Sequence, residues 1–171
     1  MQETLQKYLR AFEKLRIDRA HGIAPHKPIL LLSILQTFQI GINNSQRIYI
    51  SPELVALFKS NWSLLVISNH DCRFALPFYH LTSDKFWKLI PKPGFENILQ
   101  LSASLRSFAN LNAAVDFAVT DEDLLALMND KKVMEYYSSF YWINTSLKLN
   151  AILVIRQVGI KNYLMILRIK F

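Results

Sequence analysis

The sequence predicts a mainly helical α+β fold, a single compact domain that contains a small antiparallel β element. Its 171 residues are 51% hydrophobic, which is enough for one core but too little chain for two ordinary domains. Apolar residues recur at helical spacing in several long segments. Strand-like composition is confined to short segments, which favours a small sheet.

Two helices are predicted in the first part of the chain. Apolar side chains recur at steps of four and three, as on one helical face, at Leu5, Leu9, Phe12 and Leu15. Residues 18–27 form a predicted loop that contains Gly22 and Pro25. Pro28 suits the first position of a helix because its missing N–H needs no partner there. The apolar segment that follows predicts a buried helix that Gly41 terminates.

The middle of the chain alternates between short strands and a helix. Residues 47–50 are a predicted strand, and Ser51 with Pro52 indicates the start of a helix. Residues 75–90 are predicted as two short strands around a turn at 82–85. This segment supplies most of the small β element.

Two more helices and an atypical tail are predicted towards the end. Thr120 and Asp123 resemble a capping box at a helix start. Asp130 is expected to cap a second amphipathic helix, whose aromatic residues we interpret as its packed side. Residues 148–171 lack acids and combine Ile, Leu and Val with basic residues, which fits a hairpin around Gly159 or an aggregation-prone end.

Charge is segregated along the sequence, which carries a net charge of +7. Residues 1–106 contain 13 basic and 7 acidic residues, a net +6, whereas residues 107–135 contain 2 and 6, a net −4. Residues 136–171 contain 5 basic residues and no acidic ones. The first two thirds of the chain are therefore basic enough to attract a polyanion.

Several function classes are disfavoured by the sequence. The single cysteine, Cys72, excludes an internal disulfide, fits a reducing cytoplasm and leaves no Cys-rich zinc site. We find no signal peptide, and no apolar run reaches the ~20 residues of a membrane span. P-loop, dinucleotide-binding and nucleophile-elbow motifs are missing. We therefore expect no catalytic motif, no metal and no cofactor.

A basic pair, His26-Lys27, precedes the most apolar segment of the chain. The positive end of a helix dipole disfavours a cation by about 0.3–1 kcal/mol. The pair is explained if an anion binds there, held by backbone N–H groups and by donors that include Arg19. The alternative is a solvated lysine and a histidine that satisfies a loop carbonyl, and spacing alone leaves both interpretations open.

A second group of polar residues lies in the segment "HDCRFALPFYHL". His70, Asp71 and His80 suggest a metal or a nuclease site, but the His–Asn–His array of an HNH nuclease is missing. The alternative is a hydrophilic loop that leads into a half-buried strand.

An apolar ledge, Leu76-Pro77-Phe78, follows Arg73 in the same segment. Taken alone it is also explained by core packing. Arg106 lies among serines, a composition that contacts phosphates but that is equally typical of an exposed helix start.

Three blocks of sequence together resemble a known family: "APHKPILLLSIL", "LPFYHLTSDKFWKL" and "FAVTDEDLLALMNDKKVMEYYSSFY". They resemble the DNA sulfur-binding domain at the N-terminus of McrA-like type IV restriction endonucleases. Those restriction proteins recognise phosphorothioate-modified DNA through this domain and cut it with a C-terminal HNH domain. The resemblance covers residues 1–147, and the blocks are specific in combination rather than singly.

The resemblance implies double-stranded phosphorothioate DNA as the partner and assigns roles by position. Arg19, His26 and Lys27 are expected at the DNA backbone, and Leu76 and Pro77 in the apolar wall of a sulfur pocket. The full set of expected DNA-binding residues is Arg19, His26, Lys27, Arg73, Leu76, Pro77, Phe78, His80 and Arg106.

Two departures from the family pattern affect these expectations. Leu76 stands where many relatives have an aromatic residue before the proline. The HNH nuclease domain is missing, and residues 148–171 stand where its connection would start. We therefore expect a cytoplasmic recognition module of a type IV restriction system that has no catalysis of its own. The alternatives are a non-catalytic protein-interaction module or degenerate fragment, and a small nuclease that uses His70, Asp71 and His80.

Overall fold

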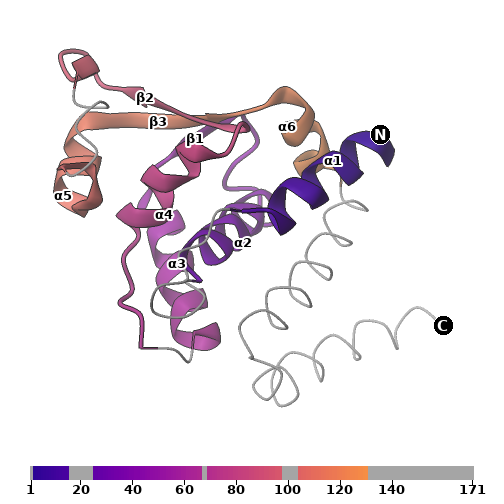
Figure 1. The fold of residues 1–171 in the computed structure, drawn as a ribbon, viewed down its shortest axis with the longest axis horizontal. Coiled ribbons are helices and arrows are strands. Elements are labelled where there is room, and N and C mark those ends of the chain that lie inside the picture. The colour runs from indigo at the N-terminus through magenta and orange to yellow at the C-terminus, as the bar shows by residue number, and fades with distance from the viewer. Residues whose placement is uncertain (1, 16–24, 67–68, 98–103, 131–171) are drawn as a thin grey trace.

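A small antiparallel sheet lies over a layer of helices in the computed structural model of the chain (Figure 1). The structure describes residues 2–15, 25–66, 69–97 and 104–130. The elements, with η for a 3-10 helix, are α1 (Gln2–Glu13), α2 (His26–Gln39), β1 (Arg47–Tyr49), α3 (Pro52–Leu65), α4 (Ala75–His80), η1 (Leu81–Ser83), β2 (Trp87–Pro91), η3 (Ser104–Arg106), α5 (Phe108–Ala114), β3 (Val115–Thr120) and α6 (Glu122–Asn129). The predicted fold class, mainly helical α+β with a small antiparallel β element, is confirmed.

The sheet has the strand order β1-β3-β2, and both outer strands are antiparallel to β3. Ala118 lies opposite Ile48 and Leu89, and all three side chains are buried. The next residue of β3, Val119, lies opposite Arg47 and Lys88, which are both exposed. Because side chains alternate across a strand, one face of the sheet covers the core and the other faces solvent.

Helix α2 crosses the centre of the core, where every side chain from 27 to 35 is buried. Two hydroxyl groups in it are satisfied by the preceding turn. The Ser33 hydroxyl donates to the Ile29 carbonyl at 2.8 Å, and the Thr37 hydroxyl donates to the Ile34 carbonyl at 2.6 Å. The helix can therefore be buried on all sides without leaving these polar groups unpaired.

Gly41 ends α2, as the sequence predicts. Its φ of 76° lies in the left-handed region. The Ile42 N–H donates to the Thr37 carbonyl at 2.9 Å, and the Gly41 N–H donates to the Phe38 carbonyl at 3.1 Å. These two bonds form a Schellman motif, which satisfies the last carbonyls of the helix.

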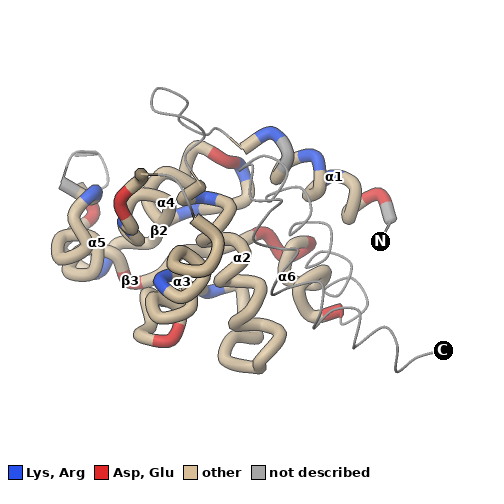
Figure 2. The backbone as a smooth tube through the Cα atoms, turned by 90° about the horizontal axis from the view of Figure 1, so that it is seen from below, with Lys and Arg blue, Asp and Glu red and all other residues tan. Residues whose placement is uncertain are grey.

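Helix α6 packs against α1 and brings acidic residues next to basic ones. The Tyr8 hydroxyl donates to Asp121 Oδ2 at 2.9 Å, and Lys7 Nζ lies 3.7 Å from Asp123 Oδ2. Figure 2 shows basic residues along α1 and acidic residues on α6 beside it. The acidic segment of the sequence therefore meets a basic helix of the same chain.

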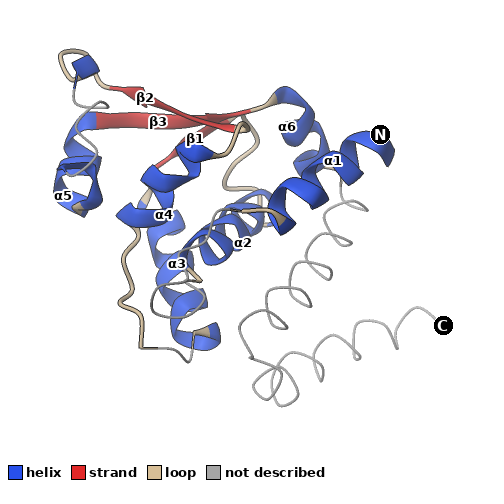
Figure 3. Cartoon of the chain, viewed as in Figure 1, coloured by secondary structure: helices blue, strands red, loops and turns tan. Residues whose placement is uncertain are grey.

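Helix α4 replaces the strand predicted at the start of residues 75–90, so that prediction is wrong (Figure 3). Phe74, Phe78 and Leu81 are buried at steps of four and three, which is the period of a helix. Pro77 lies in the first turn, where its missing N–H costs no intrahelical bond. The second predicted strand is confirmed as β2.

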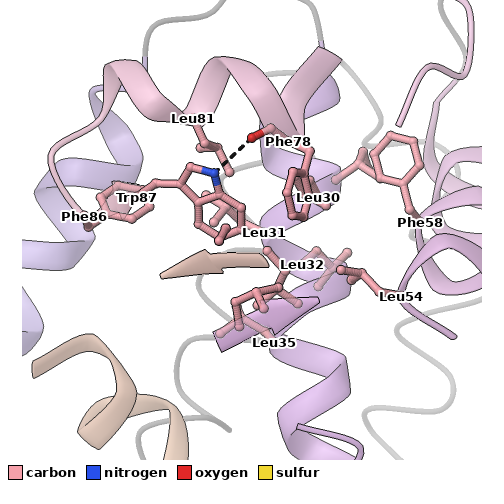
Figure 4. Close-up of a cluster of buried hydrophobic side chains, with 14 of the residues drawn as sticks. Leu30, Leu31, Leu32, Leu35, Leu54, Phe58, Phe78, Leu81, Phe86 and Trp87 are labelled. Carbon is pink, nitrogen blue, oxygen red and sulfur yellow. Dashed lines mark hydrogen bonds between the residues drawn. The ribbon is translucent and has the colours of Figure 1, made fainter. Parts of the chain in front are cut away.

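Leucine side chains, most of them from α2, and aromatic side chains from other elements pack together in the core (Figure 4). The Trp87 ring lies edge-on to the Phe78 ring with 5.2 Å between centroids, and its indole N–H donates to the Phe78 carbonyl at 2.9 Å. Phe58 of α3 is also fully buried. Each such side chain stabilises the fold by about 1.5–3 kcal/mol through burial alone.

Of the two predicted helix starts, that of α2 is shifted and that of α3 is confirmed. Helix α2 begins at His26, so Pro28 lies within the first turn and is not its first residue. Pro25 occupies the N-cap position. The predicted cap of α3 is confirmed, because the Ser51 hydroxyl accepts from the Leu54 N–H at 3.2 Å.

Two elements between 108 and 120, α5 and β3, were not predicted. Thr120 is the buried last residue of β3, and Asp121 takes the N-cap position of α6. The capping box predicted from Thr120 and Asp123 is therefore wrong, since strand pairing takes Thr120 into the core.

Some predictions fall outside the described residues. These are the placement of Arg19, the second amphipathic helix after Asp130 and the tail at 148–171. Within the described part, no helix combines the length and the apolar character that crossing a bilayer requires.

Candidate nucleic-acid interface

Four parts of the chain meet around α4. The segment 69–73 leads into α4, which packs against α2 and against η3. His26 at the start of α2 contacts the 69–73 segment, and Arg106 is the last residue of η3. The described candidate residues thus gather in one region, although they come from separate segments of the sequence.

His26 is half-buried and is held by a loop carbonyl. Its Nε2 lies 2.9 Å from the backbone oxygen of Asp71, so Nε2 carries the proton and donates. Its ring lies 4.5 Å from the Trp62 ring and 6.0 Å from the His70 ring. Burial lowers the pKa of His26 below its ordinary value, and the charges of His70 and Arg73 act in the same direction. His26 is therefore neutral at pH 7 and has the loop contact that the alternative interpretation expects.

Lys27 is buried, with only 7% of its surface exposed. Its ammonium donates to Asp84 Oδ2 at 2.8 Å and to the Ser83 hydroxyl at 2.9 Å. The Ser83 hydroxyl in turn donates to the His80 carbonyl at 2.9 Å. Lys27 thus ties the first turn of α2 to the turn after α4, and its charge is already compensated inside the protein.

Arg73 is exposed and pairs with Asp71 at 2.8 Å. Both side chains are more than half exposed, at 61% and 72%. Exposed ion pairs of this kind contribute about 0–1 kcal/mol, because water screens them. An incoming phosphate can therefore compete with Asp71 for the guanidinium at little cost.

Leu76 and His80 lie four residues apart on α4, a spacing that places them on the same side of a helix. Both side chains are half-buried. Burial lowers the pKa of His80, and the positive charges of Arg106 and Lys27 lower it further. Arg106 is the last residue of η3, which packs on α4. Among the described residues, Arg106 is exposed and forms no ion pair.

Pro77 and Phe78 point into the fold, unlike Leu76. Both are buried, and Phe78 has 0% exposure. The apolar ledge expected from the sequence is therefore reduced to Leu76 on the accessible side of α4, with Pro77 and Phe78 as its support from behind.

The described residues contain no group of three or more His, Cys, Asp or Glu side chains arranged to hold a metal ion. His70 and Asp71 lie before α4, whereas His80 is its last residue.

Ser83, Asp84 and Trp62 are the parts of this region that the sequence did not predict. Asp84 is separated from Lys27 by 57 residues, so no local spacing marks the two as partners. Trp62 lies in the helix predicted to start at Ser51 and Pro52, and its contact with His26 depends on how α2 and α3 pack.

Comparison of the sequence with protein-family models finds no match, and comparison with curated proteins finds none at a significant level. The fold and the site define a mainly helical α+β protein that exposes Arg73 and Arg106 around α4.

Proposed function

We propose that the chain binds DNA through the surface around α4 and distinguishes a phosphorothioate from an ordinary phosphate. The supporting observation is that the half-buried Leu76 and His80 share one side of α4, a helix on which η3 packs with the exposed Arg106 as its last residue. Arg73 and His26 border the same helix. This combination offers cationic donors and an apolar contact to one linkage, in agreement with the resemblance of the three sequence blocks to the sulfur-binding domain.

The chemistry of the modified linkage fits such a surface. A phosphorothioate remains anionic, so it still favours cationic donors. Its sulfur is larger, more polarisable and a poorer hydrogen-bond acceptor than oxygen, so it tolerates an apolar wall. One such contact is worth on the order of 1 kcal/mol. An unpaired phosphate oxygen against the same wall is penalised, which enlarges the discrimination to about 1–3 kcal/mol.

The structure changes the part that Lys27 plays in this proposal. Its ammonium is buried and paired with Asp84, so it is not available as a phosphate donor. Its role is to hold the start of α2 against the turn that follows α4. The exposed donors of the proposal are Arg73 and Arg106.

A Leu76→Ser variant tests the apolar contact. Its preference for a duplex with one phosphorothioate over the matched unmodified duplex should fall about 5-fold or more, because the wall becomes polar. Affinity for the unmodified duplex should stay within about 2-fold. Fluorescence anisotropy at fixed salt measures both values.

Ile40→Ser is the matched control for this variant. Ile40 is 61% exposed and caps the far end of α2 from His26, roughly 20 Å along the helix. It should leave both affinities unchanged. An unaltered sulfur preference in Leu76→Ser contradicts the proposed site. Failure of the wild-type chain to bind either duplex favours the non-catalytic protein-interaction module instead.

A further inference from the structure

The outer face of the sheet carries two rows of side chains that take no part in the core. One row crosses the strands as Arg47, Val119 and Lys88, and the other as Tyr49, Phe117 and Ile90. Arg47, Tyr49 and Lys88 are exposed, and the other three are half-buried. In Figure 1, α2, α3 and α4 lie on the opposite side of the sheet.

Aromatic rings and cations are adjacent on this face. The Tyr49 and Phe117 rings lie 5.4 Å apart at 55°, and Tyr49 is 48% exposed. The Arg47 guanidinium lies 5.0 Å from the centre of the Phe117 ring. The two rings are therefore neighbours, and a positive charge lies over the Phe117 ring.

The two charged residues of these rows, Arg47 and Lys88, are both basic and lie in the same row. Arg47 and Lys88 flank Val119 on the two outer strands, so their backbones are two strand spacings, roughly 10 Å, apart. Within the described residues neither forms an ion pair. Asp116, the acidic residue that precedes Phe117 in β3, lies at the bulge of that strand and outside the two rows.

We propose that this sheet face binds a single-stranded nucleic-acid segment. Bases stack on the exposed Tyr49 ring beside Phe117, and phosphates lie near Arg47 and Lys88. Every base has a π-face, so such a platform is tolerant of sequence, and sheets with exposed aromatic residues are a general solution for unpaired strands. The site is separate from the surface around α4, and it requires neither a duplex nor sulfur.

The test is fluorescence anisotropy of the full chain with labelled 12-nucleotide unmodified DNA and RNA single strands at several salt concentrations. The wild type should bind in a salt-dependent manner. Tyr49→Ala should weaken binding about 5- to 100-fold, because it removes one stacking ring. Tyr49→Phe should remain within about 2-fold of the wild type. Tyr49→Leu should behave like Tyr49→Ala, because it keeps apolar area without a ring.

Lys88→Ala tests the charge separately. It should reduce the slope of log affinity against log salt by about 0.7, the share of one phosphate contact on a single strand. Phe108→Ala is the control for aromatic surface, since Phe108 is 45% exposed but lies on α5 against Phe74, at 6.0 Å between ring centroids. It should not change strand binding.

Three results overturn the proposal. The first is no strand binding by the wild type, and the second is strand binding that Tyr49→Ala and Lys88→Ala leave unchanged. The third is self-association of the wild type that Tyr49→Ala abolishes while strand binding stays the same, which assigns the face to contact between copies of the chain. Arg106→Ala separates this site from the duplex site, because it should weaken duplex binding and leave strand binding intact.

Discussion

The ion pair between Lys27 and Asp84 is the most buried one among the described residues. Its two side chains are 8% and 12% exposed, and the oxygen and nitrogen atoms are 2.8 Å apart. Desolvation costs much of what attraction supplies, so such a pair adds little net stability over apolar residues. Removing one partner is different, because it leaves the other charge buried and unpaired.

Asp84→Ala should therefore lower the free energy of unfolding by about 3–5 kcal/mol. Urea denaturation measures this loss. The double variant Lys27→Met/Asp84→Leu should recover most of it, because no buried charge remains.

Asp71→Ala is the matched control, since it breaks the exposed pair with Arg73 and should cost less than about 1 kcal/mol. Equal small losses in Asp84→Ala and Asp71→Ala contradict the burial of the Lys27 pair.

Two histidines give the fold a pH dependence of defined sign. The pKa values of His26 and His80 are lowered in the folded protein, chiefly by burial. In the unfolded chain both titrate near the ordinary 6.5. As the pH falls below about 6.5, the unfolded chain takes up protons that the folded protein does not, so the folded state loses stability.

Comparing the wild type with His80→Gln isolates one histidine. Between pH 7.5 and about 5, the unfolding free energy of the wild type should fall more steeply than that of the variant. The difference in slope corresponds to at most one extra proton bound on unfolding. Chemical denaturation at a series of pH values measures the two slopes. Identical slopes contradict a lowered pKa for His80.

The sequence located the chemically interesting residues but not their burial. The sequence left two interpretations of His26-Lys27 open. In the structure, His26 donates a hydrogen bond to a loop carbonyl and Lys27 donates one to a carboxylate. That outcome depends on Asp71 and Asp84, which only the folded chain brings near α2. Arg106 was predicted as a candidate because serines surround it in the sequence. Its position near α4 follows from the packing of η3 on that helix.

At the scale of elements, long periodic segments were predictable and short ones were not. The buried helix α2, its Gly41 terminus and the Ser51 cap follow from local patterns. Helix α4 has only six residues, and such a short apolar run does not distinguish a helix from a strand. Strand β3, also six residues, was not predicted although it is the central strand. Its place depends on pairing with β1 and β2, which are distant in the sequence.

Gly41→Ala tests the terminus of α2. A side chain added at Gly41 meets no atom within 4 Å, so the cost comes from the φ of 76° alone. We expect a loss of about 1–2 kcal/mol in the free energy of unfolding. Gly41→Asn should lose less, because asparagine tolerates the left-handed region. Thermal denaturation compares the three proteins, and a harmless Gly41→Ala contradicts the role of this terminus.

At the scale of the whole molecule, the charge segregation seen in the sequence has a partial structural explanation. The acids of α6 face α1 through the Tyr8–Asp121 and Lys7–Asp123 contacts. That internal pairing uses part of the acidic segment, and Arg73 and Arg106 take no part in it. The fold class could be predicted because hydrophobic content and periodicity determine it. The surface around α4 could not, because it forms only when separate segments of the sequence pack together. The expectations for Arg19 and for residues 148–171 stay predictions.

The measurement that tests the account most directly is the affinity of the wild-type chain for two matched duplexes at the same salt concentration, one of them with a single phosphorothioate. We expect the modified duplex to bind about 5- to 150-fold more tightly, as a difference of about 1–3 kcal/mol requires. Both affinities should fall with added salt along similar slopes, since the charge of the linkage is the same. Equal affinities for the two duplexes contradict sulfur recognition by the surface around α4.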